Sequence, residues 1–294
     1  MHPLKSIVVI FLCLLQLSNA ANFSNPLKAR DGSDPFIVWD SGYYYLLTTT
    51  WTDVEITRAT TLEGLKRGEV GVIWTDTNPS RCCNVWAPEL HKVNGTWYVY
   101  YTAGNRQNLD GQRSHVLKGG PTPFSPYTYA TQLTPQWSID GTLHTLSSNL
   151  YFIWSCFPQP KLQSLCIAPL STPTSLASMS QTHILSTPTL PWERVCNPVN
   201  EGAAPLYRNN KTFIAYSASD CWTDSYQLGL LTYDGTGDPL LASSLTKTGP
   251  VFSSANGNYW TGHNAFFSSP DGKEVWNFGR AEVVGTVMGG PSGE

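Results

Sequence analysis

Five short stretches of the 294-residue sequence place polar or aromatic side chains at the same point of a recurring pattern. Three of them carry carboxylates, Asp34, Asp140 and Glu201; a fourth carries His263 and the last Trp86. Carboxylates gathered around one cavity are typical of glycosidic bond hydrolysis, which needs an acid for the leaving oxygen and a base for water. Asp34, Asp140 and Glu201 are therefore the candidate catalytic residues.

Each of these positions also has a structural explanation when it is taken alone. Asp before Pro, as at Asp34, and Asp or Glu before Gly, as at Asp140 and Glu201, are ordinary turn chemistry. An isolated histidine such as His263 is often a hydrogen-bonded core residue, and Trp86 could fill the interior. The five positions indicate a common site only because they all fall at the same point of the recurring pattern.

The elements that must position these residues form a degenerate repeat. Aromatic or β-branched runs typical of strands occur at 43–47, 97–101, 150–154, 212–216 and 274–278. A turn signal precedes each run, and ahead of each turn lies another short apolar stretch, at 36–38, 88–90, 142–144, 204–206 and 265–267. The unit recurs roughly every 50–60 residues, the range of propeller blades.

One blade cannot bury both of its faces, so several blades must pack around an axis. The sequence therefore predicts an all-β fold, a five-bladed β-propeller, with a β-sandwich as the alternative. Innermost strands begin near the axis, so equivalent positions in different blades are expected to converge there.

The chain begins with an export signal. Lys5 supplies the positive charge, residues 7–17 form an apolar run, and Ser18-Asn19-Ala20 fits a cleavage site. We expect residues 1–20 to be a signal peptide and residues 21–294 to be one propeller domain. No other apolar run is long enough to cross a bilayer, so the sequence predicts a secreted protein with no membrane partner.

Cysteine usage agrees with secretion, because six of the seven cysteines remain after the signal and can pair. Cys156 and Cys166 could bridge a hairpin, and Cys196 and Cys221 could join neighbouring segments. Adjacent Cys82 and Cys83 could form a vicinal bridge or pair elsewhere. A zinc site is the competing explanation, although no C-x-x-C pair exists. Three sequons predict a glycoprotein, at Asn22, Asn94 and Asn210.

The charge and the aromatic content limit the partners. The net charge is −3, only 13% of residues are charged, and no basic stripe is present, which argues against nucleic acid. The 11 Trp and 14 Tyr residues offer flat rings with polar edges, which suit stacking on sugars. Composition thus indicates a neutral ligand rich in hydroxyl groups.

The chain resembles glycoside hydrolase family 43, a family of five-bladed propellers. The matching motifs, in family order, are Ser33-Asp34-Pro35-Phe36, Trp86-Ala87-Pro88-Glu89, Ser138-Ile139-Asp140-Gly141, Glu201-Gly202 and Gly262-His263-Asn264. The resemblance implies that Asp34 is the general base, Glu201 the general acid, and Asp140 the residue that orients Glu201 and raises its pKa. It also implies that Trp86 lines the sugar pocket. His263 would lie near the axis, where many members hold a calcium ion largely through water; no cofactor is required.

The resemblance is strongest to secreted members that act on α-1,5-linked arabinan from the chain end, on the run from Arg81 to Glu89 and the single-domain length. It implies an inverting, monomeric enzyme whose partner is a plant polysaccharide or oligosaccharide. A β-xylosidase or an endo-arabinanase of the same fold is the alternative. A sugar-binding propeller without catalysis is an alternative of another class.

The end of the sequence departs from the family pattern. After the strand at 274–278 the family usually continues with a Tyr-His pair and further strands, whereas here Gly279-Arg280-Ala281-Glu282 and a tail rich in Gly, Ser and Pro follow. We expect residues 279–294 to leave the fifth blade incomplete, as a truncated or mis-spliced gene would.

Overall fold

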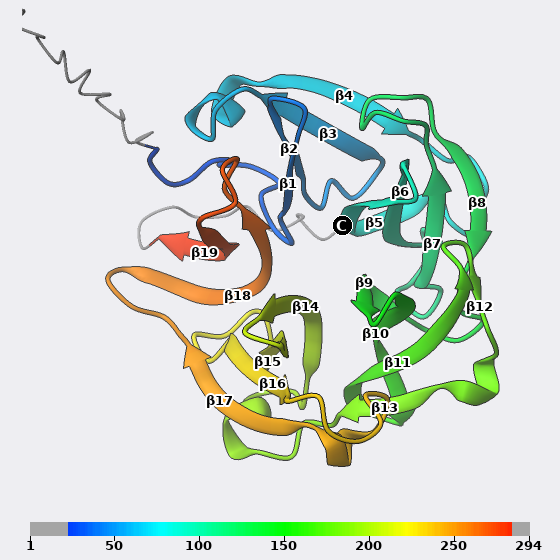
Figure 1. The fold of residues 1–294 in the computed structure, drawn as a ribbon, viewed down its shortest axis with the longest axis vertical. Coiled ribbons are helices and arrows are strands. Elements are labelled where there is room, and N and C mark those ends of the chain that lie inside the picture. Colours follow the sequence, from blue (N-terminus) through cyan, green and yellow to red (C-terminus); the bar gives the residue numbers. More distant parts are fainter. Residues whose placement is uncertain (1–22, 284–294) are drawn as a thin grey trace, which may run out of the picture.

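The computed structural model describes residues 23–283, which form an all-β, propeller-like ring of sheets (Figure 1). The predicted signal peptide, Asn22 of the first sequon and the tail beyond residue 283 lie outside these residues. The remaining sequon residues, Asn94 and Asn210, lie exposed in hairpin turns, where glycosylation stays a prediction. Among the described residues, no helix has the length and hydrophobicity needed to cross a membrane.

Four sheets contain four or five strands each. The first consists of β1 (Phe36–Asp40), β2 (Tyr43–Leu47), β3 (Val54–Ala59) and β4 (Glu69–Trp74). The second consists of β5 (Cys83–Val93), β6 (Thr96–Gly104), β7 (Arg113–Lys118) and β8 (Thr128–Gln132). The third consists of β9 (Ile139–Leu146), β10 (Asn149–Gln159), β11 (Leu162–Thr172), β12 (Ser175–Leu176) and β13 (His183–Ser186). The fourth consists of β14 (Asn200–Arg208), β15 (Lys211–Ala218), β16 (Gln227–Tyr233) and β17 (Thr246–Phe252).

Within residues 23–283, the fifth position holds two strands, β18 (Asn258–Ser268) and β19 (Val275–Val283). The same range contains four short 3₁₀ helices in the connections: η1 (Glu63–Arg67), η2 (Met179–Gln181), η3 (Pro191–Glu193) and η4 (Ala242–Ser244). The prediction of five blades is therefore confirmed only as a propeller-like all-β ring, with four full sheets in the described part of the chain. β19 itself continues five residues past the predicted strand end at 278.

The hairpins at the inner edge of the four full sheets follow directly from local sequence. Their two-residue turns are Ser41-Gly42, Asn94-Gly95, Ser147-Ser148 and Asn209-Asn210, and all eight residues have positive φ. Two consecutive positive φ values define the type I′ turn, whose twist matches that of paired strands and which Asn and Gly favour. The eight strands that the sequence predicts around these four turns are present, as are the two of the fifth pair, β18 and β19.

Alternation along the strands builds the core between neighbouring sheets. On β6, Val99 and Tyr101 pack toward the first sheet, whereas Tyr98 and Tyr100 pack toward the third. Successive strand residues point to opposite faces, so an aromatic strand with no polar face supplies both contacts. Similar clusters join the third sheet to the fourth and the two-stranded sheet to the first, where Phe267 is buried. The inner strands contact one another in the order β1, β5, β9, β14, β18 and back to β1.

Two of the proposed disulfides are present. Cys82 bonds to Cys83, and Cys156 on β10 bonds to Cys166 on β11. The pairing of Cys196 with Cys221 is wrong in this structure, because both thiols are free. Hydrogen bonds connect their two segments instead, including one from the side chain of Asn197 to that of Asp220.

Candidate active site

The site forms where five inner strands bend at equivalent residues near the axis. These residues, all with positive φ, are Asp34 (54°), Ala87 (43°), Asp140 (54°), Gly202 (55°) and His263 (42°). The pairing register shifts at this point in β5, β14 and β18, as at a β-bulge, which re-aims side chains and is frequent next to active sites. The predicted shared phase is confirmed, with Trp86 and Glu201 one residue ahead of the bend.

Hydroxyl groups on the second strand of a sheet, or just after it in the case of Thr49, attach the bend of the next inner strand to that sheet. Oγ1 of Thr49 accepts from the backbone N–H of Ala87 at 2.8 Å, and Oγ1 of Thr102 accepts from that of Asp140 at 3.2 Å. Oγ of Ser217 accepts from the N–H of His263 at 2.6 Å. These bonds satisfy backbone groups that the irregular strands leave unpaired.

The Ser155 hydroxyl occupies the corresponding place before the fourth sheet and donates to the carbonyl of Asn200 at 3.0 Å. Together with Thr49, Thr102 and Ser217 it forms a set that we call the hydroxyl ring. The sequence gives little sign of this set, because a single Ser or Thr in a strand carries no distinctive pattern.

His263 lies between two of the predicted carboxylates. Its Nδ1 is 3.1 Å from Oδ1 of Asp34 and 3.8 Å from Oδ2 of Asp140. His263 and Asp140 are buried, whereas Asp34 is half-buried and accepts a hydrogen bond from the Thr49 hydroxyl. The imidazole can approach this closely because Gly202 has no side chain, since a Cβ there would lie 3.2 Å from the ring.

Burial and charge change the pKa values of this cluster. Burial lowers the pKa of His263, but the carboxylates of Asp34, Asp140 and Glu201 outweigh it and raise that pKa overall. Burial raises the pKa of Asp140 well above its usual value; His263 opposes this shift and the charge of Glu201 adds to it. A buried cluster of like charges favours holding protons on some of its members.

Glu201 is held by two residues that the sequence motifs do not include. Gln163 on β11 donates to Oε2 at 2.8 Å, and the Tyr226 hydroxyl donates to Oε1 at 2.9 Å. Burial is the first cause of the raised pKa of Glu201; His263 and the Tyr226 hydrogen bond oppose it, and the charge of Asp34 adds to it. Burial is thus the largest cause of the raised pKa of Glu201, and the expectation that Asp140 also raises it stays a prediction.

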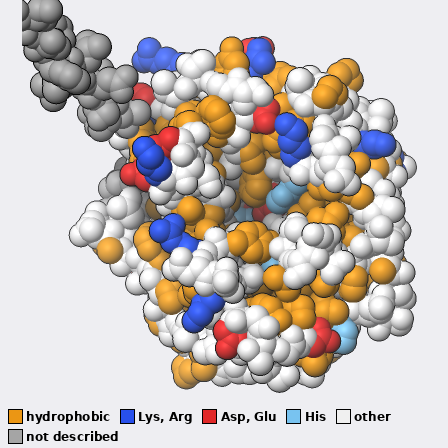
Figure 2. Space-filling model, in the orientation of Figure 1, with side chains coloured by type: hydrophobic (Ala, Val, Ile, Leu, Met, Phe, Trp, Pro, Cys, Tyr) orange, Lys and Arg blue, Asp and Glu red, His pale blue; other side chains and the backbone are white. Residues whose placement is uncertain are grey.

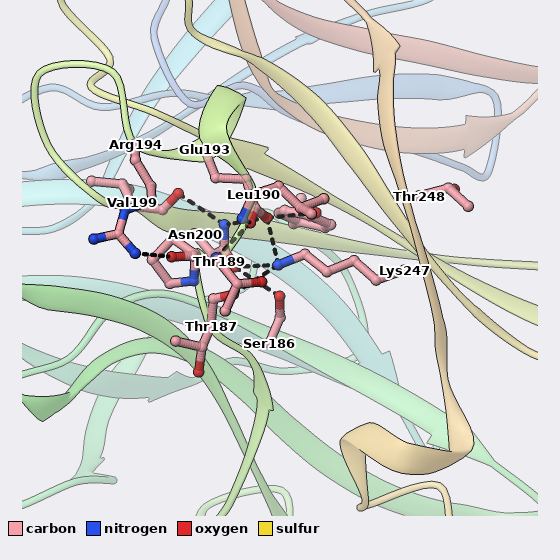
Figure 3. A network of polar contacts seen from close by, with 12 residues as sticks. Ser186, Thr187, Thr189, Leu190, Glu193, Arg194, Val199, Asn200, Lys247 and Thr248 are labelled. Carbon is pink, nitrogen blue, oxygen red and sulfur yellow. Dashed lines mark hydrogen bonds and ion pairs between the residues drawn. The ribbon is translucent and has the colours of Figure 1, made fainter.

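The residue ahead of Glu201 is fixed by a buried polar network around Glu193, in the short helix η3 (Figure 3). Glu193 accepts hydrogen bonds from Asn200 at 3.1 Å and from Tyr216 at 2.8 Å, and it pairs with Lys247. Backbone N–H groups of residues 189 and 190 donate to its other oxygen, both at 2.8 Å. The network therefore fixes the start of β14, and with it the backbone of Glu201.

Trp86 is half-buried beside the bend of β5, and its ring meets that of Trp51 edge-on with centroids 5.7 Å apart. Trp51 is 39% exposed and has positive φ, an outlier for a bulky residue that often marks a functional position. The structure thus places Trp86 at the site, and the sequence reasoning missed its partner Trp51.

Figure 2 shows the ring hollowed near its centre, with acidic and histidine side chains inside the hollow. A cavity of about 550 Å³ is lined by all five inner strands beyond their bends, and includes Phe36, Glu89, His91 and Tyr207. Its polar floor is formed by Glu89, whose Oε2 is 2.7 Å from Nε2 of His91. The space around the axis therefore continues past the carboxylate cluster.

Comparison with known proteins decides the family. The family model described as "Glycosyl hydrolases family 43" matches residues 23–285, nearly the whole chain. The chain belongs to glycosyl hydrolase family 43. The bends at Asp34, Asp140, Glu201-Gly202 and His263 all lie within the residues that the family model matches.

Three relatives show how this family 43 chain compares with known proteins. An extracellular exo-α-(1→5)-L-arabinofuranosidase of Streptomyces avermitilis is 37% identical over 87% of the chain, and one of Streptomyces chartreusis is 32% identical over 92%. The chain spans only 55% of the first relative's length and 86% of the second's. The crystal structure of an α-L-arabinofuranosidase from Lactobacillus brevis has a TM-score of 0.83 at 30% identity, covering 92% of this chain and 89% of that one.

Direct binding of the family's calcium ion by His263 does not fit these contacts. Nδ1 of His263 faces the carboxylates of Asp34 and Asp140, whose charges raise the pKa of the imidazole, whereas calcium takes oxygen ligands. Within residues 23–283, no group of three or more His, Cys, Asp or Glu side chains is placed to hold a metal ion. A calcium ion held through water stays a prediction, and no step below depends on it.

Proposed function

We propose that this chain is a secreted inverting glycosidase that releases L-arabinofuranose from α-1,5-linked arabinan or arabino-oligosaccharides. The observation that carries the proposal is the axial cluster of Asp34, Asp140, His263 and Glu201, in which burial raises the pKa of Glu201. The names of the relatives support the sugar and its linkage, and two of those names include the word extracellular.

In the proposed reaction, Glu201 protonates the departing oxygen while Asp34 takes a proton from a water on the opposite face of the furanose. Such a single displacement inverts the anomeric carbon and needs the two carboxyl groups about 6.5–9.5 Å apart. His263 holds Asp34 through its Nδ1 contact, and the raised pKa of Glu201 keeps the acid protonated at higher pH. Trp86 would line the pocket of the sugar that is released.

The decisive experiment follows the products by proton NMR during hydrolysis of debranched arabinan, beside xylo-oligosaccharides. We expect L-arabinose to be released first as the β anomer, opposite to the α linkage of the substrate. Release of xylose alone would favour the β-xylosidase alternative, and oligosaccharides as first products would favour an endo-acting enzyme. The α anomer as first product would exclude Asp34 as a water-activating base.

Replacing Tyr226 by Phe tests the protonation of Glu201. The Tyr226 hydroxyl bonds to the ionised carboxylate and so lowers the pKa of Glu201; its loss should raise that pKa further. The alkaline limb of the kcat/KM profile, which reports loss of the acid's proton, should move to higher pH. Tyr233→Phe is the matched control, because its hydroxyl donates to the carbonyl of Gly237 instead. An alkaline limb that stays in place would remove Glu201 from the role of acid.

A further inference from the structure

An exposed aromatic pair lies on the same end of the ring as the axial carboxylates. Trp222, in the loop after β15, is 58% exposed, and its ring meets that of Trp260 on β18 at 83° with centroids 6.0 Å apart. The guanidinium of Arg280 on β19 lies 4.9 Å from the first ring centroid and 5.5 Å from the second. We call these three residues the tryptophan platform.

The tryptophan platform is fixed before any ligand arrives. The Trp260 Nε1–H donates to Oδ1 of Asp224 at 2.8 Å, and the backbone N–H of Trp222 donates to Oδ1 of Asp220 at 2.9 Å. Trp260 has a φ of 55°, which a bulky residue rarely adopts. A surface ordered in this way loses little conformational entropy when it binds a ligand.

The platform is linked to Glu201 by the same loop. The backbone N–H of Tyr226 bonds to the carbonyl of Thr223, and the Tyr226 hydroxyl donates to Glu201. Cys221, adjacent to Trp222, has a pKa raised first by burial and then by the charge of Glu201, which agrees with this proximity. Trp260 stands three residues ahead of His263 on β18. The platform therefore lies on the side from which Glu201 approaches the substrate.

Its chemistry suits a neutral sugar. Indole faces pack against the C–H faces of sugars, and the guanidinium carries five N–H donors that can bind ring and hydroxyl oxygens. Among residues 23–281, whose side chains the structure describes, Arg280 makes no hydrogen bond or ion pair to another side chain. Its contacts with the two rings hold it in place and leave its donors free for a ligand.

We propose that the tryptophan platform binds the leaving-group part of the substrate, the furanose units that follow the one released. This inference rests on the proposed function, because the acid Glu201 must face the leaving oxygen. The platform is then a specificity determinant for chain substrates and takes no part in the displacement. Trp86, on β5 of the second sheet, and Trp51, between β2 and β3 of the first, would contact the sugar on the other side of the scissile bond.

The test compares two substrates of Trp222→Ala: α-1,5-arabinotriose, and methyl α-L-arabinofuranoside, which has no leaving-group ring. We expect kcat/KM for the triose to fall about tenfold, the usual effect of truncating an aromatic anchor. The value for the methyl glycoside should change less than about twofold. Trp39→Ala is the matched control, because Trp39 is 38% exposed near the opposite end of β1 and should affect neither substrate. Equal losses on both substrates, or none, would overturn the proposal.

A second measurement separates this inference from the proposed function. Calorimetry measures arabinotriose binding to Glu201→Gln and to the double variant Glu201→Gln/Trp222→Ala. Binding about tenfold weaker in the double variant supports the platform even if the wild-type chain cleaves neither substrate, which would refute the arabinofuranosidase proposal alone. Equal binding by the two variants would refute the platform whatever the activity.

Discussion

Replacing Glu201 by Gln is expected to lower kcat/KM on α-1,5-arabino-oligosaccharides by roughly 10²–10⁴, the usual contribution of a positioned acid or base. The loss should be much smaller on a dinitrophenyl arabinofuranoside, whose leaving group departs without a proton. Asp34→Asn should reduce activity on both substrates to a similar extent, because water must be activated in either case. The contrast between the two variants, measured by initial rates, assigns acid and base separately.

Folding must be excluded as the cause of these losses. Both substitutions preserve size, and each position keeps its hydrogen-bond donors nearby, Thr49 for Asp34 and Gln163 for Glu201. We therefore expect melting temperatures close to that of the wild-type chain. Glu274→Gln, in the hairpin between β18 and β19, is the control and should retain full activity. Equal losses of Glu201→Gln on good and poor leaving groups would contradict the assignment of the acid.

The largest expected effect on stability is that of Lys247→Met. Glu193 is fully buried, and removing Lys247 leaves its charge without a cation, which typically costs about 3–5 kcal/mol. For a chain of this size the melting temperature should fall by about 10 °C. Thermal unfolding followed by circular dichroism measures the change.

Two further variants make the cause explicit. In Lys247→Met/Glu193→Gln the buried charge is gone, so part of the lost stability should return. Lys273→Met removes a cation from an exposed ion pair with Asp271 and should leave the melting temperature unchanged. A double variant that is no more stable than Lys247→Met would show that the charge of Glu193 is not what Lys247 compensates.

Local signals explain why so much of the ring could be predicted. Turn dipeptides such as Asn94-Gly95 determine their own geometry, and an aromatic run such as 97–101 can only be a buried strand. Because the turn and both strands recur in phase, the convergence of Asp34, Asp140 and His263 follows from the repeat alone. The family motifs added roles to positions that the repeat had already brought together.

What could not be predicted depends on contacts between segments far apart in the chain. Gln163 and Tyr226 reach Glu201 from other strands and loops, and neither belongs to a motif. The partnership of Glu193 with Lys247 likewise requires the fourth sheet to be folded. The large effect of burial on the pKa of Glu201 could not be predicted either, since the extent of burial is a property of the assembled ring.

Among the described residues, four positions around the axis hold full sheets and the fifth holds two strands, in line with the expected incomplete fifth blade. The sequence contains five strand pairs in phase, but outer strands carry weaker patterns than inner ones, and β17 is largely exposed. The number of inner hairpins in the sequence therefore gives the number of sheets around the axis. It says little about how many outer strands each sheet contains. The two-stranded sheet of β18 and β19 still delivers His263 to the cluster.

The hydroxyl ring allows the sugar specificity of this protein to change without a change in the position of its axial backbone. Thr49, just after β2, and Thr102 and Ser217, on β6 and β15, attach the bends of β5, β9 and β18 to the preceding sheets. Mutations at exposed rim positions, such as Trp222, can therefore accumulate without displacing the axial backbone. Over evolutionary time such a scaffold can adopt new sugars while its reaction chemistry is inherited intact.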